Sequence, residues 1–160
     1  MKLILRIISW KSGLLLSVVV LLLLIVFSFY GLYTNKFYFF KFDNYIFPLL
    51  TFLHFTYLYA IWFKIREQEG PDPQMRNLEF ALYIIFFIYI YKFIDTLFIL
   101  LSYTDFESQV IPATFIPFGI VILFLYFMLL ALTLIMFKHR KAIIGTYRFD
   151  NVNDQIDTWE

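Results

Sequence analysis

The chain has 160 residues, of which 62% are hydrophobic and 23% are aromatic. Only 16% are charged, whereas about a quarter is usual for a soluble domain. The 13 basic and 12 acidic residues nearly balance, which argues against a nucleic-acid-binding protein. Without cysteine the chain has no disulfide, no thiolate metal site and no catalytic thiol. The composition therefore indicates an integral membrane protein.

The first apolar segment, residues 14–33, contains the uncharged run LLLSVVVLLLLIVF and is long enough to cross the ~30 Å hydrocarbon layer. It exceeds the apolar core of a cleaved signal peptide, and no cleavage site of small residues follows it. We therefore expect an uncleaved signal anchor. The preceding residues 2–11 either lie in the membrane interface as a short amphipathic helix or extend the first span.

Three further spans follow in the sequence. Pro48 and Pro117 fall in the first turns of two of them, where a missing N–H costs little. The stretch 64–77 is polar and contains helix-breaking residues, so it predicts an exposed turn, with Asn77 capping the next span. The predicted spans are residues 45–63, 78–101 and 114–137.

The basic residues flanking the spans predict the orientation, because they concentrate on the cytoplasmic side of a membrane protein. The sequence thus predicts an all-α, polytopic membrane protein: an up-down four-helix bundle over residues 1–137 with a tail over residues 138–160. Both termini are expected in the cytoplasm, at the inner membrane of a cell. Lys2, Arg6, Lys11, Lys64, Arg66, Arg76, Lys138, Arg140, Lys141 and Arg148 would lie on one side, and Lys36 and Lys41 on the other.

Ionisable residues within the spans are costly and need a partner or a wet cavity. Lys92 and Asp95, three residues apart on one helix, are expected to neutralise each other. Counting residues along antiparallel helices places His54 level with Lys92, and Thr51 level with Asp95. With Thr96, these residues form a candidate polar cluster between the second and third spans.

Three interpretations of this polar cluster remain open. It either fixes the register of the helices or a subunit contact, or forms an ion or proton path, or holds a ligand. Haem with two His ligands from one chain is disfavoured, because His54 is the only intramembrane His. No catalytic set, phosphate-binding loop or acidic metal cluster is present in the sequence, so we expect neither an enzyme nor a bound cofactor.

The tail changes from basic to acidic along its length, with Phe149, Ile156 and Trp159 in its acidic part. Such a segment either docks on a cytoplasmic protein or remains solvated. The predicted function is a small non-catalytic subunit or anchor of a larger inner-membrane complex. It would contact membrane lipid and other membrane subunits or further copies of itself. The alternatives are a homo-oligomeric ion channel or transporter, and a membrane sensor or effector that signals to a soluble partner.

Overall fold

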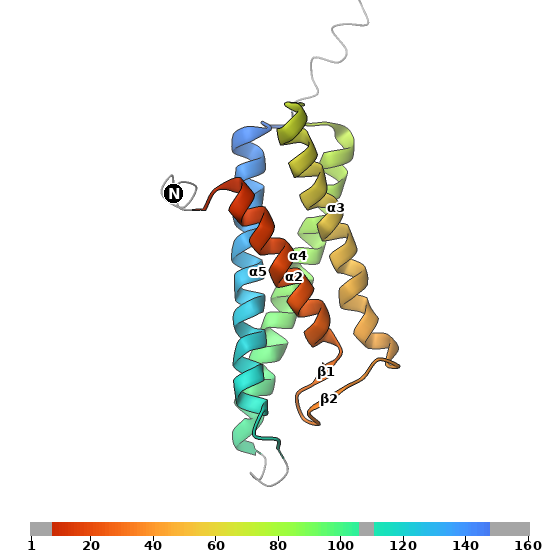
Figure 1. Cartoon of the computed structure of the whole chain (residues 1–160), viewed down its shortest axis with the longest axis vertical. Helices are drawn as coiled ribbons and strands as arrows, with labels where there is room; N and C mark the ends of the chain where they lie inside the picture. The colour runs from red at the N-terminus through yellow and green to blue at the C-terminus, as the bar shows by residue number, and fades with distance from the viewer. Residues whose placement is uncertain (1–7, 106–110, 148–160) are drawn as a thin grey trace, which may run out of the picture.

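The computed structural model describes residues 8–105 and 111–147 and shows four long helices (Figure 1). All four are long and apolar enough to cross a membrane. They run alternately up and down, which confirms the predicted all-α four-helix membrane bundle. The helices are α2 (Trp10–Ser28), α3 (Ile46–Glu67), α4 (Pro73–Leu101) and α5 (Phe115–Ile143).

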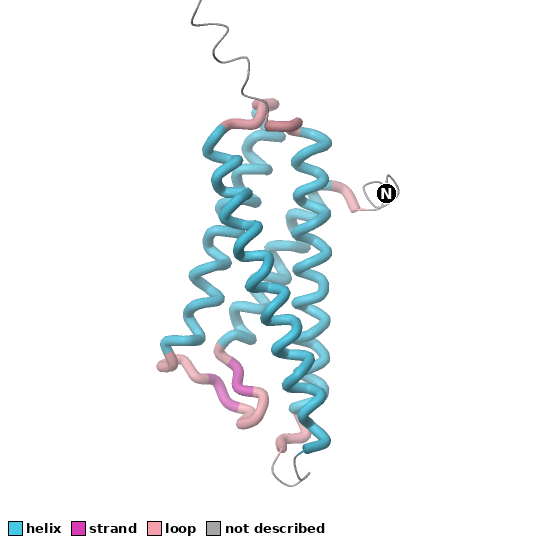
Figure 2. Tube along the Cα trace, turned by 180° about the vertical axis from the view of Figure 1, so that it is seen from behind, coloured by secondary structure: helices cyan, strands magenta, loops and turns pink. Residues whose placement is uncertain are grey.

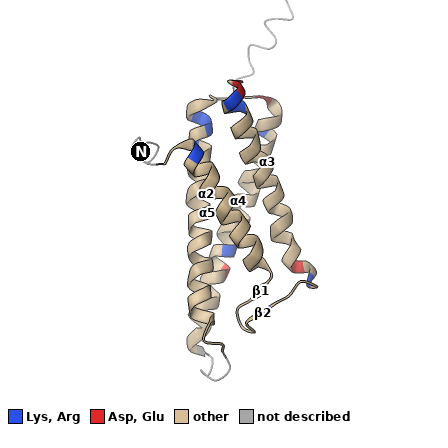
Figure 3. Cartoon of the chain, viewed as in Figure 1, with Lys and Arg blue, Asp and Glu red and all other residues tan. Residues whose placement is uncertain are grey.

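The helices form a ring in which α2 and α4 each pack against both α3 and α5 (Figures 1 and 2). One end of the bundle holds the start of α2, the α3–α4 turn and the end of α5, and is called the N/C end below. The opposite end, with the α2–α3 connection, is called the hairpin end. Lys and Arg residues gather at the N/C end (Figure 3). Aliphatic and aromatic side chains from all four helices form the core between the two ends.

The α2–α3 connection contains secondary structure that the sequence analysis did not predict. Helix α2 ends at Ser28, five residues before the predicted end of its span. Strands β1 (Tyr30–Gly31) and β2 (Lys36–Phe37) follow and pair antiparallel. The short helix η1 (Phe42–Tyr45) then leads into α3. Aromatic packing holds the hairpin against α5, since the Tyr30 and Phe118 rings meet edge to face with centroids 5.2 Å apart.

Helix α4 begins at Pro73, not at the predicted residue 78, because Asp72 caps it in place of Asn77. The Asp72 carboxylate accepts a hydrogen bond of 2.7 Å from the Met75 amide. The Lys64 Nζ lies 2.7 Å from a carboxylate oxygen of Asp72 and 2.7 Å from one of Glu69, so one ammonium group forms ion pairs with two residues of the α3–α4 turn. The hydrogen bond from Lys64 lowers the pKa of Asp72, assisted by the Met75 amide. The ionised Asp72 carboxylate therefore stabilises the folded turn. This contribution is fully present at pH values above the ordinary Asp pKa, and it is lost as the pH falls through the lowered pKa of Asp72.

Helix α5 matches its predicted start closely but not its predicted end. It starts one residue after the predicted position, with Pro117 in its first turn, but continues past residue 137 to Ile143. The basic residues that were expected to begin the tail are therefore helical, and the name tail is used below for residues 148–160, which follow the described residues. The helix η2 (Ser102–Asp105) extends α4 at the hairpin end.

Glycines permit close helix contacts at two places in the bundle. A Cβ built on Gly13 of α2 would lie 3.1 Å from the Met136 sulfur of α5. A Cβ built on Gly119 of α5 would lie 3.1 Å from Cγ of Leu100 in α4 and overlap one of its methyl groups. Small residues at helix crossings are the usual means of close packing in membranes. The α4–α5 contact near the hairpin end therefore depends on Gly119.

Gly119→Val should destabilise the bundle by about 1–3 kcal/mol, because the added methyl groups overpack the contact with Leu100. Thermal unfolding of the purified protein in detergent measures the change. Gly70→Val is the control, since nothing lies within 4 Å of a Cβ at Gly70. Adding Leu100→Ala to Gly119→Val should recover part of the loss; a double variant no more stable than Gly119→Val alone would disprove the proposed steric cause.

Candidate functional site

A buried cluster of charged and tyrosine side chains lies at the N/C end, where α3, α4 and α5 meet. Glu79 lies in the second turn of α4, and Arg140 lies in the last turn of α5. Both are buried, with 1% of Glu79 and 6% of Arg140 exposed. They form an ion pair between the Arg140 Nη2 and the Glu79 Oε1. Two helices that run in opposite directions are thus linked by a charge pair inside the bundle.

Three tyrosine hydroxyls complete the surroundings of the Glu79 carboxylate. Tyr83 donates to Oε1 at 2.7 Å, one helical turn further along α4. Tyr147, after the end of α5, donates to Oε2 at 2.7 Å, and Tyr57 of α3 donates to the same oxygen at 3.3 Å. A buried carboxylate is tolerated only when such partners replace its hydration. The hydroxyls and the guanidinium together provide that replacement.

The same cluster fixes the chain as it leaves α5. The Arg140 guanidinium lies 4.4 Å from the centre of the Tyr147 ring and donates from Nη1 to the Gly145 carbonyl at 3.0 Å. Gly145 has a φ of 109°, which lets the backbone turn back towards the bundle. Burial raises the pKa of the Tyr147 hydroxyl, and its hydrogen bond to Glu79 raises it further. Tyr147 therefore remains protonated and able to donate that bond at neutral pH.

The sequence analysis did not identify this cluster. With α4 expected to start at residue 78, Glu79 fell in the first turn, and Arg140 was assigned to a basic membrane flank. Both helices in fact extend further towards the N/C end, so both side chains are held inside the bundle. The available signal was a Glu with a Tyr four residues later in an apolar helix, which is a hydrogen-bonding spacing.

Replacing the buried carboxylate tests its structural role. Glu79→Gln should destabilise the protein by about 3–5 kcal/mol, because Arg140 is left buried without a counter-charge. Glu67→Gln is the matched control: its ion pair with Arg66, at 3.7 Å, is exposed, so the loss of this pair should cost at most ~1 kcal/mol. Unfolding in detergent measures both. Equal stability of the two variants would show that the Glu79–Arg140 pair does not hold the bundle together.

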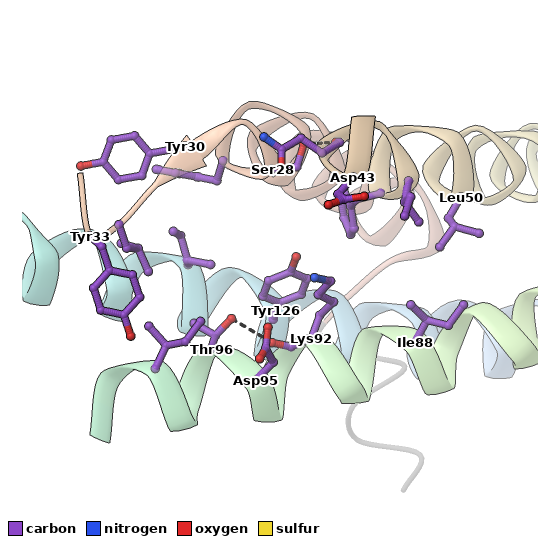
Figure 4. Close-up of a pocket in the computed structure, with 17 residues that line it drawn as sticks. Ser28, Tyr30, Tyr33, Asp43, Leu50, Ile88, Lys92, Asp95, Thr96 and Tyr126 are labelled. Carbon is purple, nitrogen blue, oxygen red and sulfur yellow. Dashed lines mark hydrogen bonds between the residues drawn. The ribbon is translucent and has the colours of Figure 1, made fainter. Parts of the chain in front are cut away.

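A second polar site is a cavity of about 310 Å³ at the hairpin end. All four helices and the hairpin contribute to its wall, and α3 and α4 diverge towards it (Figures 1 and 2). The cavity brings together three of the predicted cluster residues, Lys92, Asp95 and Thr96 (Figure 4). Tyrosines from the hairpin and from α5 add hydroxyl groups to the same wall; they are Tyr30, Tyr33 and Tyr126.

Lys92 and Asp95 do not form the ion pair that their spacing predicted. Among the described residues, neither side chain has an ion-pair partner within 4.0 Å or a side-chain hydrogen bond. Lys92 extends past Tyr126, whereas Asp95 stays close to α4 beside Thr96 (Figure 4). Spacing of three residues permits contact along a helix but does not require it, because long side chains can turn into an adjacent space. Here that space is the cavity.

Thr51 and His54, the other two predicted cluster residues, are buried in α3 and do not line this cavity. Thr51 donates to the Phe47 carbonyl in its own helix at 2.7 Å. His54 Nδ1 is hydrogen-bonded to the Tyr89 hydroxyl of α4 at 3.2 Å, and its Nε2 has no partner among the described residues. His54 thus meets α4 one turn before Lys92, so the predicted cluster divides into two separate sites.

Three further features are the predicted docking residues of the tail, the second histidine and the possible metal ligands. The candidate docking residues Phe149, Ile156 and Trp159 lie outside the described residues. His139 of α5 is buried, and its Nε2 donates to the Ile8 carbonyl at 2.9 Å. Within the described part of the chain, no group of three or more His, Asp or Glu could hold a metal ion.

Comparison with known proteins adds no assignment. No family model matches the sequence, and neither curated proteins nor solved structures gave a match.

Proposed function

We propose that the chain is a small non-catalytic subunit or anchor of a larger membrane complex, and that it docks a partner at its N/C end. The observation that supports this most directly is the fixed position of Tyr147, immediately before the tail. Glu79 accepts the Tyr147 hydrogen bond and Arg140 packs on the Tyr147 ring. The tail over residues 148–160 thus starts from a defined point on the bundle, as a docking segment requires.

The exposed aromatic side chains of the spans provide a second surface for this function. In α3 and α4, Phe52 is 72% exposed, Phe87 70% and Tyr91 63%. Aromatic side chains on a membrane bundle contact lipid or the helices of a partner subunit. We propose that other subunits pack on this surface while the tail binds a cytoplasmic protein.

The proposed orientation places the N/C end in the cytoplasm, because the Lys and Arg residues gather there. Single cysteines at Asn35, Gln68, Gln109 and Gln155 test it in a chain that has no cysteine of its own. A membrane-impermeant thiol reagent applied to intact cells should label only positions 35 and 109. Labelling at 68 or 155, with protection of positions 35 and 109, would show that the chain has the opposite orientation. Lysed cells, in which all four positions should react, are the control for reactivity.

Removing the tail tests the docking role. Deletion of residues 148–160 should leave insertion intact, since the ion pair and α5 precede the deletion, but should release the cytoplasmic partner. Co-purification in mild detergent followed by mass spectrometry measures partner recovery. Full recovery of every partner with the truncated chain would exclude the tail as a docking segment.

The anchoring of the tail root can be tested separately. Tyr147→Phe removes the hydroxyl that donates to Glu79, so it should cost about 0.5–1.5 kcal/mol in stability and lower partner recovery. Tyr38→Phe is the matched control, because Tyr38 is 40% exposed and follows β2 at the hairpin end, away from Tyr147 and from the aromatic surface of the spans. If both variants recover the partner equally well, docking does not depend on how Tyr147 is held.

A further inference from the structure

The cavity at the hairpin end combines opposite charges that do not satisfy each other. Lys92 and Asp95 both line it, and neither has an ion-pair partner among the described residues. A third charged residue on the wall, Asp43, has a side chain that is 75% exposed and lies 3.9 Å from Lys41, so solvent screens its charge. The two less exposed charges, Lys92 and Asp95, sum to zero. Such a site favours a ligand that carries both an anionic and a cationic group over a simple ion.

The position of the cavity along the bundle points to the source of such a ligand. Its wall includes the last residues of α2, Phe27 and Ser28, and the first residues of α3, Ile46 and Phe47. Counted from Arg76 at the N/C end, Asp95 lies 19 residues along α4, or about 28 Å at the rise of an α-helix. The hydrocarbon layer is about 30 Å thick. The charges therefore lie near the lipid headgroups on the hairpin side.

Part of the cavity wall is apolar and can contact the acyl chains of a lipid. Leu50, Ile88, Ile99 and Ile122 contribute apolar surface next to the charged groups. The α3 residues Ile46 and Leu49 are 56% and 74% exposed near the same end, so acyl chains can pass from the cavity onto the bundle surface. A volume of about 310 Å³ is in the range of small-molecule sites.

We propose that this cavity binds the phosphate-and-ammonium headgroup of a zwitterionic phospholipid of the ethanolamine type. Lys92 contacts the phosphate, and Asp95 accepts hydrogen bonds from the ammonium. Thr96, whose hydroxyl donates to the Lys92 carbonyl at 2.8 Å, fixes the helix turn that carries both charges. The ligand supplies the counter-charges that Lys92 and Asp95 do not give each other.

Lipid retention by the full-length protein tests the site. The protein is reconstituted in vesicles of equal parts phosphatidylethanolamine and phosphatidylglycerol, extracted in mild detergent and analysed for bound lipid by mass spectrometry. The unchanged protein should retain phosphatidylethanolamine in excess of phosphatidylglycerol. Loss of the phosphate contact in Lys92→Met should lower its retention about tenfold. Lys141→Met, at an exposed position at the N/C end, is the matched control and should retain lipid as the unchanged protein does.

Asp95→Asn should change which lipid is preferred, whereas misfolding would only reduce the retention of both lipids. It removes the negative charge but keeps Lys92, so the preference should shift from phosphatidylethanolamine towards the anionic phosphatidylglycerol. Competition with free phosphorylethanolamine distinguishes the source of the headgroup: displacement shows that the headgroup alone is bound, and no displacement shows that the acyl chains contribute. Retention of both lipids in the vesicle ratio by the unchanged protein, or an unaltered preference in Asp95→Asn, would overturn the proposal.

Discussion

The Glu79 carboxylate and the Arg140 guanidinium lie inside the bundle, where water cannot compensate either charge. Such a pair is tolerated only when each group has a close counter-charge and further hydrogen bonds. Several features of the N/C end follow from this requirement. Helix α5 must remain helical beyond its apolar part, α3 must present Tyr57, and the chain after α5 must turn back so that Tyr147 reaches the carboxylate. One ion pair thus links three helices and the root of the tail.

The hairpin end is organised by a difference in helix length. The end of α2 (Ser28) and the start of α3 (Ile46) line the same cavity as Thr96, whereas α4 continues past Thr96 to Leu101 and into η2. The β1–β2 hairpin occupies part of the space beside α5, and the cavity is what remains. Charged side chains in a membrane span normally face a cavity or a partner. Lys92 and Asp95 meet this condition through the cavity, without pairing with each other.

The two ends therefore use charge in different ways. At the N/C end the Glu79 and Arg140 charges are buried and paired with each other, which suits a rigid attachment point for other proteins. At the hairpin end Lys92 and Asp95 line a cavity and have no ion-pair partner among the described residues, which suits reversible binding of a small group. These arrangements support the two proposed roles, partner docking at the N/C end and phospholipid binding at the hairpin end.

The sequence by itself determined the membrane class, the four helices and their alternation, because long uncharged apolar runs leave a chain no other way to satisfy its backbone in lipid. It also singled out Lys92 and Asp95 as unusual, since charge within an apolar run is visible without a structure. Only the tertiary structure decided the partners of the polar side chains. Glu79 meets Arg140, 61 residues away, and His54 meets Tyr89 instead of lying level with Lys92. These contacts depend on where each helix starts and on how the helices are rotated. A shift of one turn, which hydropathy does not resolve, changes every partner across a helix interface.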